Sequence, residues 1–409
     1  MEVKRENSDL RRQKLLLVVP MLHQGGFERV CVRTARIMEQ DFEVTIAMCS
    51  DEDIAYDITG LSTVNLNVPA QDGALRKVIN VVKRVKRLRD LKRKICPDIT
   101  YSFGPTANLI NVLTPVCGQI WTGIRSYMDM DNPGKLRLFI ERSDRVLCCS
   151  KVIAKELSER FSTQKAQVLY NPYDGVKIRQ MAQEKDTDMP DFTGKKLMVS
   201  MGRNDDCKEF WHLIKALFLI RDAIPEAALC IIGDGDFTEY KELVRRLEIE
   251  ERVYFAGLRR NPFPWLSAGT LYLGASSMEG FPNALVEAMS CGLAAVFSNC
   301  KSGPAEILSD RFEEVNGVQE IREERYGILI PVMDDKKNLD PSVITEEEER
   351  LAGLLETLLK DDRRLEYLSE QALERAAQFH DRAYRDEILR FAQNSGMEGD
   401  MEKEREKDA

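Results

Sequence analysis

Short apolar runs alternate with amphipathic stretches along most of the chain. The first run, residues 14–20, is typical of a buried parallel strand, and residues 27–40 have the spacing of an amphipathic helix. Further strands are predicted in this part of the chain at 42–48, 99–103, 119–122 and 145–149. Strands that alternate with helices in this way predict an α/β domain built on a parallel sheet.

The alternation lapses at residues 187–196, a polar stretch with proline and glycine, and then resumes. Strands are expected at 197–201, 228–232, 253–256, 270–273 and 294–297, with helices at 212–224, 237–247 and 282–291. The pattern therefore predicts an N-terminal Rossmann-like domain over residues 1–185 and a C-terminal Rossmann-like domain over residues 186–375. Charged amphipathic helices are predicted at 346–359 and 361–392, and the polar residues 396–409 are predicted to be disordered.

The composition restricts the class of protein. Of the 409 residues, 43% are hydrophobic and 31% are charged, which is the balance of a soluble globular protein. Because 59 Lys and Arg stand against 68 Asp and Glu, the net charge is -9 and no nucleic-acid partner is expected. The ten cysteines are scattered without the spacing of a metal site, and we expect reduced thiols in a cytoplasmic protein. The apolar run at 15–22 is too short for a membrane span, so neither a signal peptide nor a transmembrane helix is predicted.

Open α/β sheets bind ligands beyond the carboxyl ends of their strands, so two such sheets predict a cleft between the domains. Residues 279–287, which follow the predicted strand at 270–273, are the most informative segment at such an end. Pro282 suits the first position of a helix, where the amides of Asn283 and Ala284 and the helix dipole favour a phosphate. The start of this helix is therefore a candidate anion site.

Two carboxylates flank that candidate anion site. Glu279 precedes the helix and Glu287 lies within it, so both can accept hydrogen bonds from the hydroxyls of a sugar. Together with a phosphate site they indicate a sugar nucleotide. The alternative is that Glu279 is a solvated loop residue and Glu287 a residue of the helix surface.

Cations are predicted at the carboxyl end of the first strand of the second domain. Gly202 and Arg203 close that strand and Lys208 follows shortly after, so a guanidinium and an ammonium can reach a diphosphate. The alternative for each cation is an ordinary surface position. At the end of the first strand of the chain, Gly25 and Gly26 form a turn that lets the backbone approach a ligand closely.

Taken in order, these segments resemble the family 4 retaining glycosyltransferases of the bacterial polysaccharide and glycolipid type, which have the GT-B fold. The resemblance rests on GGFERV near the start, GR followed by a lysine, GDGD after a strand, FAGLRRNPFPWLSAGTLYLGASSMEGFPNALVEAMSCG, and SGPAEIL. It spans residues 14–330, and the pair of glutamates at 279 and 287 is its most specific part. It implies two Rossmann-like domains that face each other across a cleft, with a C-terminal helix at 376–395 that crosses back to the first domain.

The resemblance also implies roles for single residues. Arg203 and Lys208 would hold the donor diphosphate. Glu279 would read the donor sugar and help to orient the reacting centre, and Glu287 would hold the nucleotide ribose. The remaining donor contacts would come from the backbone of Phe281, Pro282, Asn283 and Ala284, from the loop of Gly25 and Gly26, and from Leu258 beside the base.

The activity that the resemblance implies is transfer of a hexose-type sugar from a nucleoside diphosphate sugar, with retention of the anomeric configuration. UDP is the expected nucleotide, and no metal or other cofactor is expected. Catalysis would then consist mainly of positioning and of stabilising the charge on the leaving group. The expected acceptor is a saccharide or a lipid-linked sugar in the synthesis of a surface polysaccharide or glycolipid.

One departure from the family concerns a histidine that many relatives carry at the end of the strand at 99–103 or of the next strand. This chain has Gly104 after the first and Arg125 after the second. His23, on the loop of Gly25 and Gly26, is a candidate substitute, and a plain polar loop residue is the alternative. Arg125 would bind an acceptor phosphate unless it forms a structural ion pair.

Two other motifs suggest a metal and are set aside. Residues 129–131 match the DxD motif of the other glycosyltransferase fold, but they are not predicted to follow a strand. Residues 233–236 lack the later glutamate of a calcium loop and are predicted to form a turn. No metal ligand is assigned.

A basic helix is predicted at residues 75–95, where ten Lys or Arg stand against one acid, Asp90. Its apolar stripe consists of Leu75, Val78, Ile79, Val82, Val85, Leu88, Leu91 and Ile95. Such a helix can lie on an anionic membrane surface, which would make the protein peripheral on the inner face of the plasma membrane. The alternative is that the stripe packs on the sheet while the cations face water.

Two other functions fit parts of the sequence. A catalytically degenerate paralogue would bind a nucleotide sugar and support a partner transferase. The missing histidine is compatible with it, whereas the four charged donor-site residues at 203, 208, 279 and 287 argue against it. A Rossmann-type oxidoreductase would need G-x-G-x-x-G after the first strand, and residues 23–28 do not fit that pattern.

Overall fold

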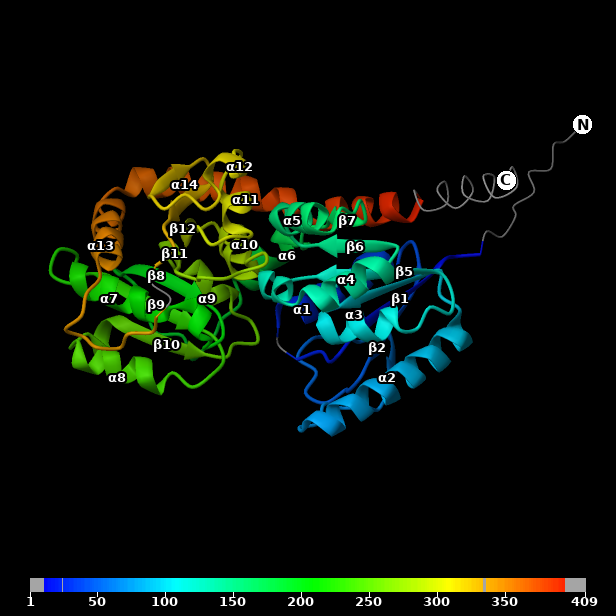
Figure 1. Cartoon of the computed structure of the whole chain (residues 1–409). Helices are drawn as coiled ribbons and strands as arrows, with labels where there is room; N and C mark the ends of the chain where they lie inside the picture. The colour runs from blue at the N-terminus through cyan, green and yellow to red at the C-terminus, as the bar shows by residue number, and fades with distance from the viewer. Residues whose placement is uncertain (1–10, 24, 334–335, 394–409) are drawn as a thin grey trace, which may run out of the picture.

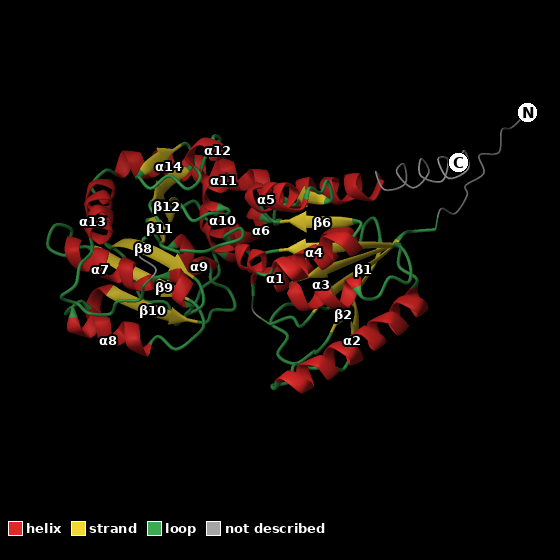
Figure 2. Ribbon diagram, viewed as in Figure 1, coloured by secondary structure: helices red, strands yellow, loops and turns green. Residues whose placement is uncertain are grey.

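The computed structural model describes residues 11–23, 25–333 and 336–393 of the chain. Its strands form two seven-stranded sheets (Figure 1), and helices cover both faces of each sheet (Figure 2). The first sheet has the order β3-β2-β1-β4-β5-β6-β7 with all strands parallel. In chain order its strands are β1 (Lys14–Val19), β2 (Glu43–Met48), β3 (Ser62–Asn65), β4 (Ile99–Phe103), β5 (Gln119–Ile124), β6 (Arg145–Cys148) and β7 (Ala166–Val168).

The alternation of side chains along β1 separates the two faces of this sheet. Leu15, Leu17 and Val19 join one apolar cluster with α1, whereas Leu16 and Val18 join another with α2 and α3. Because both faces are covered, β1 is apolar at every position after Lys14. The helices of this part are α1 (Gly26–Met38), α2 (Ala74–Ile95), α3 (Pro105–Val112), α4 (Pro133–Arg142), α5 (Lys151–Phe161) and α6 (Gly175–Met181).

The second sheet has the order β10-β9-β8-β11-β12-β14-β13, and only the edge strand β13 runs antiparallel. Its strands are β8 (Lys196–Met201), β9 (Ala227–Ile232), β10 (Val253–Gly257), β11 (Leu271–Gly274), β12 (Ala294–Ser298), β13 (Arg322–Glu324) and β14 (Gly327–Ile330). Its helices are α7 (Phe210–Ile220), α8 (Thr238–Arg246), α9 (Phe263–Ser267), α10 (Asn283–Ser290), α11 (Pro304–Leu308), α12 (Phe312–Val315), α13 (Glu346–Leu359) and α14 (Asp362–Ala376). The two Rossmann-like sheets predicted from the sequence are confirmed.

The last predicted helix, at 361–392, is interrupted. The helix α14 ends at Ala376, a turn follows, and residues 381–393 are helical again. This second segment returns to the first domain: Asp381 pairs with Arg33 at 2.6 Å, and the Tyr384 hydroxyl lies 2.7 Å from that of Thr34. Its apolar side joins the core of β1 and α1, so the predicted crossing back is confirmed.

An aromatic cluster joins the two domains behind the cleft. Tyr170 of the first domain, Phe281 of the second and Phe379 after α14 have ring centroids 5.2 to 5.5 Å apart. They belong to one apolar cluster that includes residues of both sheets. Tertiary packing therefore fixes how the two halves face each other.

The ten cysteines are all free thiols, and six of them are buried. None of the helices within the described residues combines the length and the apolarity that a membrane span requires. The tail at 396–409, for which disorder is predicted, lies outside the described residues.

Candidate active site

A cavity of about 1640 Å³ lies between the two domains, at the carboxyl ends of both sheets. It brings together every predicted site residue except His23, which does not line it. The first domain contributes Gly25, Gly26 and Arg125, and the second contributes Gly202, Arg203, Lys208, Leu258, Glu279, Phe281, Pro282, Asn283, Ala284 and Glu287. The predicted cleft is therefore present.

The helix α10 points its first turn into this cavity. Pro282 is the residue before the helix, with φ −66° and ψ 97°, and the helix begins at Asn283. The prediction that Pro282 occupies the first helical position is thus wrong by one residue, because its ψ angle is still extended. The carbonyl of Pro282 accepts the first helical bond from the amide of Leu285 at 3.1 Å. The amides of Asn283 and Ala284 lie in the first turn, where a helix offers no carbonyl partner.

Lys208 and Glu279 form an ion pair on the wall of the cavity. The ammonium lies 2.5 Å from Glu279 Oε1, and the Glu279 side chain is only 12% exposed. Burial alone would lower the pKa of Lys208, but the carboxylate raises it, and the net shift is upward. Lys208 therefore stays charged. The alternative that Glu279 is a solvated loop residue is wrong.

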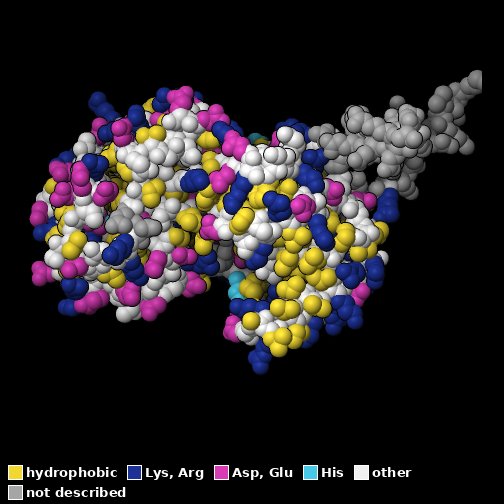
Figure 3. All heavy atoms as spheres, in the orientation of Figure 1, with side chains coloured by type: hydrophobic (Ala, Val, Ile, Leu, Met, Phe, Trp, Pro, Cys, Tyr) yellow, Lys and Arg dark blue, Asp and Glu magenta, His cyan; other side chains and the backbone are white. Residues whose placement is uncertain are grey.

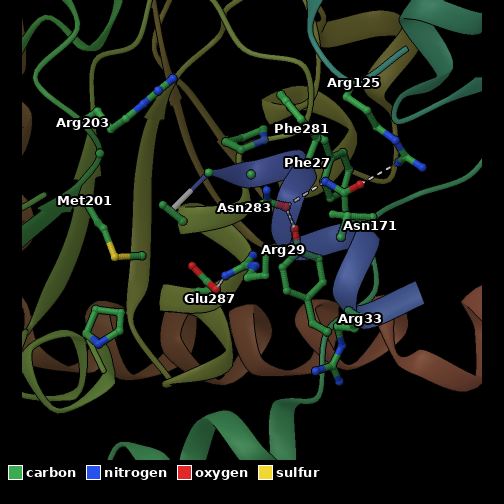
Figure 4. A pocket seen from close by; sticks show the side chains of 18 of the residues that line it. Phe27, Arg29, Arg33, Arg125, Asn171, Met201, Arg203, Phe281, Asn283 and Glu287 are labelled. Carbon is green, nitrogen blue, oxygen red and sulfur yellow. Dashed lines mark hydrogen bonds and ion pairs between the residues drawn. The ribbon is translucent and has the colours of Figure 1, made fainter. Parts of the chain in front are cut away.

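Gly202 makes room for Lys208. A Cβ atom at Gly202 would lie 3.2 Å from Cε of Lys208, closer than side-chain carbons usually approach. The next residue, Arg203, is exposed at the cavity and extends from the end of β8 (Figure 4). Because β8 pairs with the central strand β11 of its sheet, both cations lie near the middle of the carboxyl edge.

Glu287 is buried and forms an ion pair with Arg29 of the other domain (Figure 4). The alternative that Glu287 is a residue of the helix surface is therefore wrong. Arg29 comes from the first turn of α1 and also lies over the ring of Tyr173, 5.7 Å from its centroid. The pair connects α1 of the first domain with α10 of the second.

A chain of hydrogen bonds runs from Arg125 to the start of α10 (Figure 4). Arg125 donates to Oδ1 of Asn171 at 2.9 Å, and Asn171 donates to Oδ1 of Asn283 at 2.8 Å. The Tyr173 hydroxyl donates to the same Asn283 oxygen at 2.5 Å. Asn283 is therefore held by the first domain at both bonds.

Arg125 has neutral partners rather than a carboxylate. Its guanidinium bonds Asn171 and the Tyr101 hydroxyl, and it lies over the rings of Tyr101 and Phe103 at 5.6 and 5.4 Å. Among the described residues it makes no salt bridge, so the predicted alternative of a structural ion pair is not what the structure contains. Arg125 also lines the cavity.

The loop of Gly25 and Gly26 is packed from both sides. A Cβ atom on Gly26 would lie 2.9 Å from Nδ2 of Asn283, across the cleft. A Cβ atom on Gly25 would lie 2.2 Å from the carboxylate of Glu28. The Tyr56 hydroxyl fixes the loop by accepting from the Gly25 amide at 2.9 Å and donating to its carbonyl at 2.6 Å. A side chain at either position would therefore have to displace the side chain of Glu28 or of Asn283.

The two motifs set aside have structural roles. Residues 129–131 do follow a strand, β5, contrary to the prediction, and they form a single 3₁₀ turn. The Asp129 carboxylate accepts from the amides of Arg125 and Ser126 at 3.2 and 3.3 Å, and burial raises its pKa. Residues 233–236 form the turn between β9 and α8, as predicted, with Gly235 at φ 124°.

Sequence reasoning missed several residues of this region. Arg29 lies inside the GGFERV segment, so the segment itself could have pointed to it. Asn171 and Tyr173 follow the three-residue strand β7, which carries no clear strand pattern. Glu306, in SGPAEIL, caps a helix of the other domain by accepting from the amides of Lys151 and Val152 at 2.7 and 3.1 Å.

Comparisons with known proteins agree with this geometry. A family model described as glycosyl transferases group 1 matches residues 195–338. The N-acetylgalactosamine-N,N'-diacetylbacillosaminyl-diphospho-undecaprenol 4-alpha-N-acetylgalactosaminyltransferase of Campylobacter jejuni is 26% identical over 385 residues, which cover 90% of this chain and 96% of that protein. An uncharacterized glycosyltransferase of Methanocaldococcus jannaschii is 28% identical over 252 residues, which cover 59% of this chain and 62% of that protein.

Among solved structures, Anabaena HepE in complex with UDP has a TM-score of 0.69 at 19% identity, and the match covers 93% of this chain and 100% of that chain. Two facing Rossmann-like sheets, a cavity at their carboxyl edges and a helix that crosses back define the GT-B fold. The family model and the Campylobacter relative support the resemblance of this chain to the family 4 glycosyltransferases.

Proposed function

We propose that the protein transfers a hexose-type sugar from a nucleoside diphosphate sugar to a saccharide or lipid-linked acceptor in the synthesis of a surface polysaccharide or glycolipid. One observation carries the proposal. Two cations, two carboxylates and a helix start meet in one cavity, opposite the glycine loop of the other domain. The HepE structure contains UDP, which supports UDP as the nucleotide.

The diphosphate would lie between the first turn of α10 and the cations of β8. Amides at a helix start and the helix dipole favour phosphate oxygens, and Arg203 and Lys208 add charge-assisted bonds. Glu279 holds Lys208 at 2.5 Å, so the ammonium is already oriented before a donor arrives. Glu287 would accept from the ribose hydroxyls with the oxygen that Arg29 leaves free, and Leu258 would contact the base.

The reaction breaks the bond between the anomeric carbon and the diphosphate oxygen and forms a bond from that carbon to the acceptor oxygen. We propose attack from the same face, so that the anomeric configuration is retained and the leaving diphosphate oxygen takes the acceptor proton. Glu279 would stabilise the positive charge that develops on the sugar ring. Arg203, Lys208 and the start of α10 would stabilise the charge of the departing diphosphate, and we propose that they do so without a metal.

The acceptor would enter from the first domain, where Arg125 supplies a cation for a phosphate group. The Campylobacter relative is named for a diphospho-undecaprenol acceptor, which supports a lipid-linked sugar diphosphate here. An acceptor of that kind would place the reaction at the cytoplasmic face of a membrane. His23 does not line the cavity, so the proposal gives it no role.

The first experiment is a thermal-shift screen of the whole chain against UDP, GDP, ADP, their sugars and NAD, each with and without EDTA. Ligands that bind the native state raise the melting temperature. We expect a shift with UDP and one UDP-sugar that EDTA leaves unchanged, followed by release of UDP when an acceptor is added. A shift with NAD alone, or no shift with any of the nucleotides, would overturn the proposal. A shift without turnover would favour the degenerate paralogue.

A further inference from the structure

The basic helix α2 is oriented in an unexpected way. Its buried residues are Asn80, Arg84, Leu88 and Lys92, which recur every four residues and therefore share one face. Three of the four are polar or charged. In contrast, the apolar side chains of its first half are exposed: Leu75 by 75%, Val78 by 63%, Ile79 by 44% and Val82 by 64%.

The buried polar face is satisfied by hydrogen bonds, most of them to backbone carbonyls. Asn80 donates to the Pro69 carbonyl at 2.8 Å and Arg84 to the Val68 carbonyl at 2.9 Å. Lys92 donates to the side chain of Asn111 at 2.8 Å, and burial lowers its pKa to about 7. These bonds fix the rotation of the helix, so its first apolar turns cannot reach the sheet.

Neither predicted arrangement of α2 holds for the whole helix. Leu88 is buried, and Val85, Leu91 and Ile95 pack against the sheet, as the alternative of simple packing expects. Val82 and the apolar residues before it in the stripe do not pack on the sheet. Two of the ten predicted surface cations, Arg84 and Lys92, are buried instead.

The exposed cations lie beside this apolar surface. Arg76, Lys77, Lys83, Lys86 and Arg87 are exposed and form no salt bridge with a carboxylate of the described residues. The only acid of the helix, Asp90, lies 3.9 Å from Arg93. Figure 3 shows hydrophobic side chains gathered over α2 with Lys and Arg along their border. In a chain of net charge -9, this is a local surface of the opposite sign.

We propose that the surface formed by Leu75, Val78, Ile79 and Val82 with the neighbouring cations binds an anionic lipid bilayer. We name it the α2 surface. The apolar side chains would enter the boundary between headgroups and acyl chains, while the flanking Lys and Arg reach the lipid phosphates. Charge complementarity selects an anionic bilayer as the occupant, because a neutral surface would leave the cations without partners.

The α2 surface lies on the side of the domain where a lipid-linked acceptor would be needed. The strand β3 ends at Asn65 on the carboxyl edge of its sheet, and α2 begins shortly after, at Ala74. The exposed first half of α2 is therefore the half nearer the edge that lines the cavity. The proposal goes beyond glycosyl transfer, since binding to lipid requires neither donor nor acceptor.

The test is co-sedimentation of the full chain with vesicles of phosphatidylcholine alone and of phosphatidylcholine mixed equally with phosphatidylglycerol. We expect binding to the mixed vesicles only, weakened by salt. Two triple variants, Leu75→Ser with Val78→Ser and Val82→Ser, and Lys83→Glu with Lys86→Glu and Arg87→Glu, should each lower the affinity at least about tenfold. Arg84 is left intact because it holds the Val68 carbonyl.

Matched controls use exposed residues elsewhere. Lys135→Glu with Arg137→Glu and Arg142→Glu on α4 removes the same charge, and Val176→Ser with Ile321→Ser and Val343→Ser removes exposed apolar groups. Both controls should bind as the parent does. Equal loss in the controls, equal binding to neutral vesicles, or a chain that dimerises through α2 and ignores vesicles would each overturn the proposal. Because UDP-induced stabilisation is measured separately in the same variants, a failure of lipid binding is distinct from a failure of the donor site.

Discussion

The Arg29 guanidinium of α1 pairs with the Glu287 carboxylate of α10, so a residue of the glycine-loop segment holds the carboxylate proposed to bind the ribose. Arg29 contacts Oε1 of Glu287, and the ribose hydroxyls are proposed to bind Oε2. The glycine loop and the ribose position are thus coupled through one ion pair. This contact gives the first domain a direct influence on the proposed donor site of the second.

We predict that Arg29→Gln weakens UDP binding by about three- to tenfold, because Glu287 loses the cation that orients it. Isothermal titration of UDP measures the change. In a double-mutant cycle with Glu287→Gln, the two substitutions should be coupled by roughly 0.5–3 kcal/mol in the free energy of unfolding. The control is Arg382→Gln, an exposed cation that also lines the cavity. Additive effects of the two substitutions would show that the ion pair does not orient Glu287.

We predict that Lys208 and Glu279 have different roles, Lys208 in binding UDP and Glu279 in the transfer step. Glu279→Gln should lower kcat about 100-fold while UDP still binds, because the charge stabilisation lost is that of the transition state. Lys208→Ala should instead raise the Kd for UDP, since the diphosphate loses an ammonium. The control Asp57→Asn removes a carboxylate that lines the same cavity and should keep kcat. A Glu279→Gln variant with unchanged kcat would remove this residue from the reaction.

The sequence predicts the central strands well because their apolar runs are long and buried on both faces, as in β1 and β12. The strands β3, β7 and β13 are only three or four residues long and partly exposed, so they leave no such pattern. Most of the residues proposed to bind the donor could be grouped from the sequence since they lie in two short segments after strands. The roles of Asn171 and Tyr173 could not be predicted, because they depend on a contact with Asn283 that only the fold creates. The rotation of α2 could not be predicted either, because it depends on bonds to loop carbonyls that the hydrophobic periodicity does not encode.

Glu306 forms a second link between the domains. Its buried carboxylate caps α5 and accepts from the Tyr170 hydroxyl at 2.9 Å. Glu306→Gln removes the charge and one acceptor oxygen, and we expect a loss of about 1–3 kcal/mol in the free energy of unfolding. Urea unfolding measures it, with the exposed Glu313→Gln as the control. Equal stability of the two variants would mean that the Glu306 cap contributes little to the contact between the domains.

The last prediction concerns Glu28, whose side chain is buried beneath Gly25. Burial raises its pKa to about 7, although Arg203 opposes the shift, and Oε2 has no hydrogen-bond partner among the described residues. The titratable groups that interact with it are Arg203, the Cys31 thiol and the Tyr56 hydroxyl. The carboxyl is therefore held in its neutral form more firmly in the folded chain than in the unfolded chain.

This shift has a definite sign in the pH dependence of stability. The folded state binds the Glu28 proton up to about pH 7, whereas the unfolded state releases it near the ordinary glutamate pKa of 4.5, so stability falls as the pH rises between these values. The full shift corresponds to roughly 3 kcal/mol. Glu28→Gln cannot ionise, so its stability relative to the parent should rise by up to that amount between about pH 5 and about pH 8. Urea unfolding of both proteins at the two pH values checks this, and a difference that does not change with pH would mean that the folded chain accommodates the Glu28 charge.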